Sequence, residues 1–199
     1  MHTLKKTNVP IFPLKSVALP GSIQSLQIFE PRYVNMIKES LKSESGFVIA
    51  FFDKGDIKNN ILISKKGSYV KIIDFNNLPN GLLGITVKSE YKVAINNICQ
   101  LEDGLNIGDV EAMVDPEVDD QAILAEYPEF INILTQIMKH PKVIEMPIEV
   151  DFDSADSIAY HLGGLIPLTS EEKQSLLEAF DASQRFAILS KCIERMNDQ

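Results

Sequence analysis

The feature that most limits the fold is a change in the spacing of apolar residues near position 116. Before it, short apolar runs are separated by turn-forming clusters such as Pro79-Asn80-Gly81 and Glu102-Asp103-Gly104. This pattern is typical of strands joined by tight turns. After it, apolar residues recur at helical spacing, first along residues 122–139. The sequence therefore predicts a β-rich half followed by a helical half.

Charge divides the chain at the same point. Residues 1–115 hold 13 Lys and Arg against 12 Asp and Glu, whereas residues 116–199 hold 6 against 16. The total formal charge of −9 is thus split into +1 and −10. We therefore expect two domains, residues 1–116 and residues 117–199. The acidic second domain would repel phosphate groups, which argues against nucleic acid as its partner.

Two apolar segments of the first domain make opposite predictions about burial. The continuous run Phe47–Phe52 predicts a strand that is buried on both faces or central in a closed sheet. Val9–Leu14 contains Pro10 and Pro13, which donate no backbone hydrogen bond, so we expect an edge or irregular strand. Many short strands with one helix among them indicate a barrel or a sandwich.

The helices have recognisable ends. Pro31 favours a helix that starts there and runs to about Leu41. In the second domain, Pro128 lies inside the helical pattern, so that helix begins there or kinks. A helix follows at Ser154–Leu165, and Thr169-Ser170-Glu171-Glu172 predicts a capping box before the next one. Asp181-Ala182-Ser183-Gln184 repeats that pattern before the last helix.

Several motifs of nucleotide and metal binding are missing. The chain has no G-x-x-x-x-G-K and no G-x-G-x-x-G segment, so we expect no nucleotide. His2, His140 and His161 have no second His or Cys at ligand spacing, and His161 fits a side chain of the helical domain better than a metal ligand. We therefore expect no metal and no cofactor.

One pair of residues could suggest nucleophilic catalysis. Ser170 and Lys173 share a helix face, as serine–lysine enzymes require. Glu171 and Glu172 would keep Lys173 charged and unsuited to act as a base, so the capping box explains this segment better. We expect no catalytic residues and no enzyme activity.

Membrane insertion and export are not expected. The longest apolar run, Phe47–Phe52, is far shorter than the roughly 20 residues of a membrane-spanning helix. Prolines and Lys15 interrupt the N-terminal apolar stretch where a signal peptide would need continuity. Only Cys99 and Cys192 occur, which fits a reducing compartment. We therefore expect a cytoplasmic protein.

Several segments resemble the Lon protease N-terminal domain family in order and spacing. They are Val9–Leu14, Val17–Gly21, Leu26–Tyr33, Gly46–Ala50 and Leu78–Val87. The stretch from Lys173 to Arg185 is similar to the closing helices of stand-alone members. The resemblance extends from about residue 8 to residue 196.

The resemblance implies an α+β fold, in which a PUA-like β-barrel containing one helix precedes a helical bundle. In full-length Lon this domain precedes an ATPase module and a serine–lysine peptidase, and it helps to capture unfolded or tagged substrates. At 199 residues we expect a stand-alone member without those modules. The implied function is non-catalytic binding of unfolded or exposed peptide segments, or of a partner protein.

The segment Phe29-Glu30-Pro31-Arg32 fits a structural role at a strand-to-helix junction. Pro31 would fix φ, Glu30 would cap the helix, and Arg32 would pair with a carboxylate. The residues that follow on the same helix are candidates for substrate binding. Tyr33 and Ile37 would lie at the rim of a groove that accepts apolar peptide.

The chain departs from the family at Ser89–Ala94, where the family has a glycine and then a basic-aromatic-basic strand. The departure affects either a contact surface or barrel packing, and Val93 can supply the packing. Two other functions remain open. Lysines at 54, 58, 65, 66 and 71 could form an RNA-binding patch, and the barrel could hold a small molecule.

Overall fold

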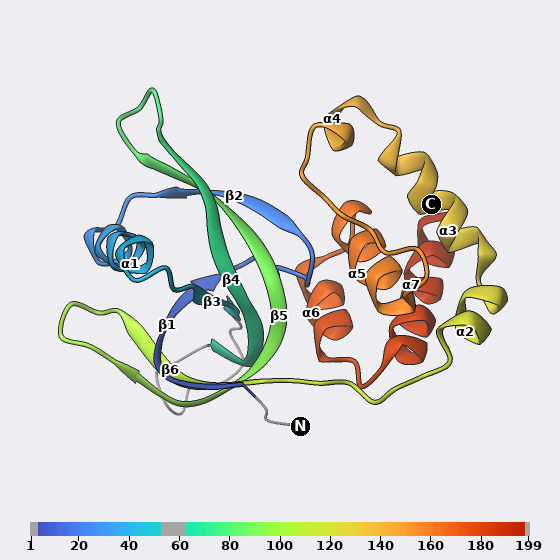
Figure 1. The fold of residues 1–199 in the computed structure, drawn as a ribbon, viewed down its shortest axis with the longest axis horizontal. Helices are drawn as coiled ribbons and strands as arrows, with labels where there is room; N and C mark the ends of the chain where they lie inside the picture. The colour runs from blue at the N-terminus through green and yellow to red at the C-terminus, as the bar shows by residue number, and fades with distance from the viewer. Residues whose placement is uncertain (1–3, 53–62, 198–199) are drawn as a thin grey trace. The chain divides into compact units, whose positions relative to one another are not determined.

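The computed structural model describes residues 4–52 and 63–197 and divides into two compact units (Figure 1). Unit 1 comprises the chain up to Ala18 and Ile23–Met113, and unit 2 comprises Leu19–Ser22 and the chain from Val114 onward. The sequence assigned residues 19–22 to the first domain. Their membership of unit 2 depends on packing against residues more than a hundred positions away, which no local pattern reveals.

Unit 1 contains six strands and one helix. The strands are β1 (Lys5–Leu14), β2 (Ile23–Ile28), β3 (Phe47–Phe52), β4 (Ile63–Asn77), β5 (Leu83–Gln100) and β6 (Asn106–Ala112), and the helix is α1 (Pro31–Lys42). The sheet order is β2-β5-β4-β3-β1-β6, and an additional pairing of β5 with β6 closes it into a barrel. The long strand β5 extends beyond the closed part to pair with β2. With the helices of unit 2, this confirms an α+β fold.

Strand β3 is buried on both faces, as its apolar run predicts. Phe47 and Ile49 belong to a cluster with α1, while Val48 and Ala50 point into the barrel. All four side chains are at most 2% exposed. The barrel interior is filled by these and other apolar side chains, among them Ile11, Tyr69, Val93 and Ile95.

Of the two alternatives predicted for β1, the edge strand is wrong and the irregular strand is confirmed. Its first part pairs with β6 and its last part, from Ile11, pairs in parallel with β3. Over most of its length β1 is therefore paired on only one of its two edges. Pro10 and Pro13 lack a backbone N–H, and this is tolerated on the unpaired edge. The register with β6 shifts between Lys6 and Val9, where Asn8 has a positive φ of 53°.

Unit 2 is helical. Its helices are α2 (Asp120–Glu126), α3 (Pro128–Met138), α4 (Pro141–Ile144), α5 (Ala155–Leu165), α6 (Ser170–Glu178) and α7 (Ala182–Asn197). Of the two possibilities at Pro128, a new helix begins there. None of the helices in the described ranges is long and apolar enough to cross a membrane.

The predicted capping box of α6 is confirmed. The Thr169 hydroxyl accepts a hydrogen bond from the Glu172 N–H, and the Glu172 carboxylate accepts one from the Thr169 N–H. The repeat before α7 differs in one bond. Asp181 accepts from the Gln184 N–H, but the Gln184 side chain accepts from Phe180 rather than from Asp181.

A buried arginine joins separate parts of unit 2. The Arg185 side chain is 0% exposed and pairs with Asp115, which precedes α2, and with Asp156 of α5. Its guanidinium group also lies 4.6 Å from the ring centroid of Tyr160. Two carboxylates and an aromatic face thus compensate the burial of one positive charge.

Residues 19–22 pack against α5 within the same unit. Leu19 is 1% exposed, and its Cδ1 atom lies beside Gly163. Gly21 adopts a φ of +79° and lies so close to the His161 ring that a Cβ there would be 2.7 Å from the ring. Glycine is needed at this position for both reasons.

Candidate functional site

A cavity of about 720 Å³ opens in unit 1 where the ends of several strands meet the start of α1. Its apolar side chains come from segments that are far apart in the sequence. They are Phe12, Pro13, Leu14, Ile28, Phe29, Tyr33, Phe52 and Ile63. A cavity of this size with mostly apolar walls is typical of a ligand-binding site.

The cavity has a buried aromatic floor and exposed aromatic side chains at its mouth. Phe12 and Tyr33 are 7% and 5% exposed, and their ring centroids are 4.3 Å apart. Phe29 is 69% exposed and Phe52 is 37% exposed. An aromatic side chain with this much exposed surface is available to bury apolar area on a partner.

Polar side chains fix one wall of the cavity. The Nη2 atom of Arg32 lies 2.7 Å from Oε2 of Glu30, and Nη1 donates to the carbonyl oxygen of Gly104 at 2.5 Å. The guanidinium group also lies 4.7 Å from the ring centroid of Tyr33. Arg32 therefore pairs with a carboxylate, as predicted, and it holds the aromatic ring of Tyr33 in position.

The predicted capping role of Glu30 is wrong. Glu30 occupies the N-cap position of α1, but its side chain makes no capping hydrogen bond. The carboxylate points to Arg32 instead. The ion pair competes successfully for the carboxylate because it offers a charged partner, whereas the helix N-terminus offers only partial charge.

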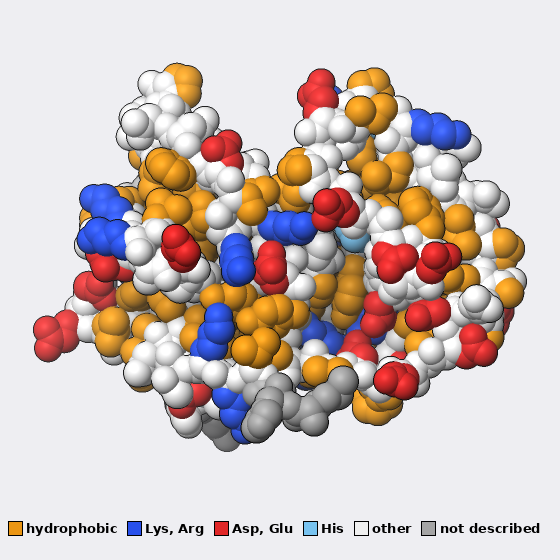
Figure 2. Space-filling view, viewed as in Figure 1, with side chains coloured by type: hydrophobic (Ala, Val, Ile, Leu, Met, Phe, Trp, Pro, Cys, Tyr) orange, Lys and Arg blue, Asp and Glu red, His pale blue; other side chains and the backbone are white. Residues whose placement is uncertain are grey.

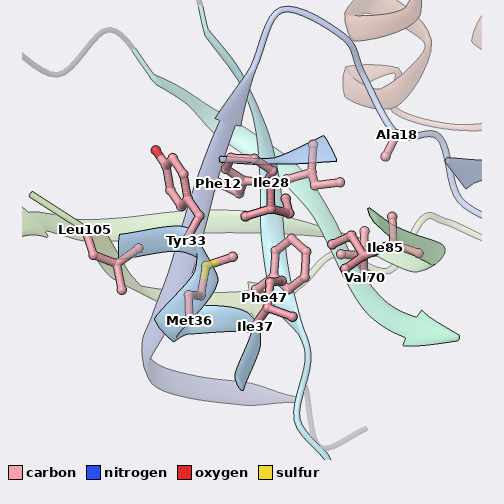
Figure 3. Close-up of a cluster of buried hydrophobic side chains, with 12 residues drawn as sticks. Phe12, Ala18, Ile28, Tyr33, Met36, Ile37, Phe47, Val70, Ile85 and Leu105 are labelled. Atoms are coloured by element: carbon pink, nitrogen blue, oxygen red, sulfur yellow. The ribbon is translucent and has the colours of Figure 1, made fainter. Parts of the chain in front are cut away.

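Tyr33 and Ile37 both project from α1 into the same apolar cluster, but only Tyr33 also lines the cavity. Tyr33 lines the cavity, and its hydroxyl points away from Met36 and Ile37 (Figure 3). Ile37 is 1% exposed and packs in the apolar cluster beneath the helix, so it is not among the lining residues. The helix thus presents Tyr33 to the cavity and holds it there through Ile37.

The surroundings of Tyr33 raise the pKa of its hydroxyl. Burial raises the pKa of Tyr33 above its ordinary value, the Arg32 charge lowers it, and the Glu30 charge raises it, with a net increase. A neutral phenol both donates and accepts hydrogen bonds. Tyr33 can therefore contact apolar groups with its ring and a peptide backbone with its hydroxyl.

The segment that departs from the family pattern contributes to packing. Val93 is 0% exposed and belongs to the barrel interior. Tyr91 stacks on Tyr69, with ring centroids 5.2 Å apart and planes 14° apart. No residue from 89 to 94 lines the cavity.

The lysines considered for an RNA patch are divided. Lys54 and Lys58 lie outside the described residues. Lys65 and Lys66 are neighbours on β4, so their side chains point to opposite faces of the strand. Lys65 and Lys71 are exposed, whereas Lys66 is half-buried.

The residues weighed for catalysis or metal binding have structural surroundings. Burial lowers the pKa of Lys173, and its Nζ donates to the carbonyl of Gly164. The expectation that the neighbouring glutamates keep Lys173 charged stays a prediction. Within α5, Nδ1 of His161 lies 2.7 Å from the carbonyl oxygen of Ser157. Among the residues that the structure describes, no group of three potential metal ligands occurs.

Sequence reasoning missed most of the cavity. It assigned Phe29 only a structural role, and it did not connect Phe12, Phe52 or Asn106 with the site. These residues come from four separate segments, which only the closed sheet brings together. The one available local signal was the aromatic residue before Glu30-Pro31, which follows a strand and is exposed.

Charge is distributed differently on the two units. On the face shown in Figure 2, the charged side chains over the helices of unit 2 are mainly acidic, while on unit 1 Lys and Arg side chains are interspersed with acidic ones. Apolar side chains appear between the charged groups on unit 1. The cavity therefore lies in the unit without a large excess of negative charge.

Comparison with known proteins gives a consistent result. The model of the ATP-dependent protease La (LON) substrate-binding domain matches residues 8–195. The chain is 24% identical over 197 residues to Lon protease of Heliobacterium modesticaldum, covering 94% of this chain and 24% of that protein. It is 23% identical over 204 aligned positions to Lon protease 1 of Bacillus subtilis, covering 98% and 25%. The chain thus spans about a quarter of the length of these relatives.

Two solved structures have a similar fold. A Lon N-terminal domain protein from Xanthomonas campestris superposes with a TM-score of 0.75 at 24% identity, covering 94% of this chain and 98% of that one. The N-terminal domain of Mycobacterium avium complex Lon protease gives a TM-score of 0.67 at 18% identity, covering 92% and 95%. At these identities the similarity shows a shared fold.

Proposed function

Because the chain belongs to the family of ATP-dependent protease La substrate-binding domains, we propose that it binds exposed apolar segments of unfolded or flexible proteins and catalyses no reaction. The proposed site is the cavity of unit 1, with Phe29 and Tyr33 as its principal contacts. Ile37 supports Tyr33 from within the core. The observation that carries this proposal is an aromatic residue, Phe29, left 69% exposed at the mouth of an apolar cavity.

The chemistry of the cavity suits a peptide. Phe12, Phe29 and Phe52 offer apolar surface for Leu, Ile or Phe side chains, whose burial contributes roughly 1.5–3 kcal/mol each. Around them, Gln27, Gln100 and Asn106 carry amide groups that can pair with a peptide backbone. Mixed lining of this kind recognises apolar side chains without requiring one sequence.

The test uses a fluorescein-labelled peptide rich in Leu and Phe and the same peptide with Ser in their place. Fluorescence anisotropy should show saturable binding of the apolar peptide only. Phe29→Ala should weaken it about tenfold, because truncating an aromatic contact costs on the order of 1–2 kcal/mol. Phe29 is largely exposed, so this variant should fold normally.

Phe180→Ala is the matched control. Phe180 is 68% exposed but lies on unit 2, outside the cavity lining. The Phe180→Ala variant should bind the apolar peptide like the wild-type protein. Equal weakening by both substitutions, or no binding of the apolar peptide at all, would contradict the proposed site.

A small molecule is a less favoured ligand. The barrel interior, where the sequence suggested such a pocket, is filled by Val48, Val93, Ile95 and their neighbours. The cavity instead borders the cluster beside α1, to which Phe12, Ile28 and Tyr33 belong. We therefore assign this cavity to peptide side chains.

A further inference from the structure

The outer edge of β2 is open. β2 pairs with β5 through six consecutive residue pairs, from Ile23 with Lys88 to Ile28 with Leu83. In the described part of the chain it is the terminal strand of the sheet order, with no strand on its other side. Alternate N–H and C=O groups of a strand point to each side, so one set on β2 faces away from the sheet.

This edge has none of the usual features that prevent pairing. The sequence Ile23-Gln24-Ser25-Leu26-Gln27-Ile28 has no charged residue and no proline. Its register with β5 contains no bulge. Natural sheets usually protect an exposed edge with lysine, proline or a bulge, and an edge without them is a template for another strand.

The same edge leads into the cavity. Gln27 and Ile28 end β2, Phe29 follows directly, and all three line the cavity. A backbone that follows β2 therefore arrives at the exposed ring of Phe29. The open hydrogen-bonding groups and the apolar cavity are two parts of one continuous surface.

We propose that the bound peptide adds to the sheet as a further strand along β2 and places its apolar side chains toward the cavity. This inference rests on the proposed function and specifies the form in which a peptide is recognised. Leu26 and Ile28 face the apolar cluster beside α1, whereas Ser25 and Gln27 are exposed. An added strand continues these two faces, so it needs apolar side chains at every second position on one face only.

The occupant is a flexible peptide rather than a second copy of the chain. In antiparallel pairing of two β2 strands, the residues that would continue toward the cavity are those that precede Ile23. These are Leu19–Ser22, which pack in unit 2 and are not free to extend. A segment of an unfolded protein has no such constraint.

The test compares two labelled peptides of identical composition. One has Leu or Phe at every second position, and the other has the same residues at helical spacing. The alternating peptide should bind about tenfold more tightly, because only it can satisfy the edge hydrogen bonds and the apolar face together. In hydrogen exchange, it should protect amides at alternate positions of residues 23–28.

N-methylation of the peptide provides a second measurement. The alternating peptide is methylated at every second residue, in each of the two possible sets. At least one set should weaken binding about tenfold, because it removes the donors directed at β2. Ser25 is exposed on β2 and is not among the cavity-lining residues, so Ser25→Lys adds a charge to the strand that would be paired. This substitution should weaken binding, whereas Ser183→Lys on α7 should not.

The outcomes separate this inference from the proposed function. Binding of the apolar peptides without protection of residues 23–28, or with both methylated sets bound normally, overturns strand addition and leaves peptide capture intact. Binding of no peptide overturns both. Protection of β2 that rises with protein concentration in the absence of peptide shows a second copy on the edge and also overturns the proposal.

Discussion

At the scale of single residues, Arg185 is the clearest case of a side chain whose importance comes from its partners. It is completely buried, and it is the common partner of Asp115, Asp156 and the ring of Tyr160. A buried ion pair adds little net stability compared with an apolar replacement, but removal of one partner leaves uncompensated charge. The consequences of substituting Arg185 therefore depend on what remains behind.

We expect Arg185→Ala to lower the free energy of unfolding by about 3–5 kcal/mol, because it removes a completely buried side chain together with its ion pairs to Asp115 and Asp156. Urea unfolding followed by circular dichroism measures this loss. The control is Arg195→Ala, which removes an exposed arginine from its pair with Glu172. A pair with this much solvent contact contributes far less than a buried one, so similar losses in the two variants would contradict the role assigned to Arg185.

At the scale of elements, α6 and α7 are linked through one carboxylate. Glu172 closes the capping box of α6 and pairs with Arg195 of α7. Burial raises the pKa of Glu172, but hydrogen bonds from Arg195, Thr169 and Cys192 lower it more, so the pKa lies below its ordinary value of 4.5. The ionised form is therefore favoured by the fold.

A carboxyl group with a lower pKa in the folded state stabilises the fold above its unfolded pKa and loses that contribution as pH falls. We expect Glu172→Gln to be less stable than the wild-type protein at neutral pH. The difference should begin to shrink as the pH falls below about 4.5, the pKa of the unfolded state. It should vanish only below the lower pKa of the folded state, where the wild-type carboxylate is also protonated. Urea unfolding of both proteins at neutral pH and below pH 4.5 measures the difference in stability. A difference that does not change with pH would contradict the role assigned to the Glu172 carboxylate.

Elements with a local signal were predictable from the sequence. The burial of β3 followed from its continuous apolar run, and the start of α6 followed from Thr169 and Glu172. The pairing of β1 was not predictable. Pro10 and Pro13 suggested an edge or irregular strand, whereas in the structure β1 pairs first with β6 and then with β3. Glu30 was misjudged for a related reason, since its choice between a helix end and Arg32 depends on side-chain geometry.

The candidate site was only partly predictable. Tyr33 was identified from its place in the motif, but its neighbours Phe12 and Phe52 were not, because they reach the cavity only through the closure of the sheet. Ile37 shares a helix face and a buried cluster with Tyr33, yet one more turn along α1 carries it beyond the cavity lining. Periodicity identifies a face and does not tell where along that face the core ends.

At the scale of the whole molecule, the course of the chain between the two units is the main feature. Leu19–Ser22 leaves unit 1, packs against α5 in unit 2, and is followed by β2 back in unit 1. Unit 2 therefore has a stabilising contribution from a segment that the sequence places among the strands. The stability of unit 2 thus depends on residues 19–22 as well as on residues from 114 onward.

We expect Leu19→Ala to destabilise unit 2 by about 2–5 kcal/mol, because it leaves a cavity beside Gly163 in a fully buried position. Hydrogen exchange measures the effect by unit. The amides of α5 should lose protection more than those of β3. Val17→Ala is a nearby control, since Val17 is buried in unit 1. In this variant the amides of β3 should lose more protection than those of α5.

The excursion of residues 19–22 also bears on how such a chain can be divided. A protease that cuts once near residues 114–119 would break the chain but not the packing. The C-terminal fragment would still pack against Leu19–Ser22 of the N-terminal fragment. Likewise, a gene segment encoding only residues from 114 onward would produce a helical bundle with an unfilled groove along α5. Recombination can therefore move these two units together far more easily than either one alone.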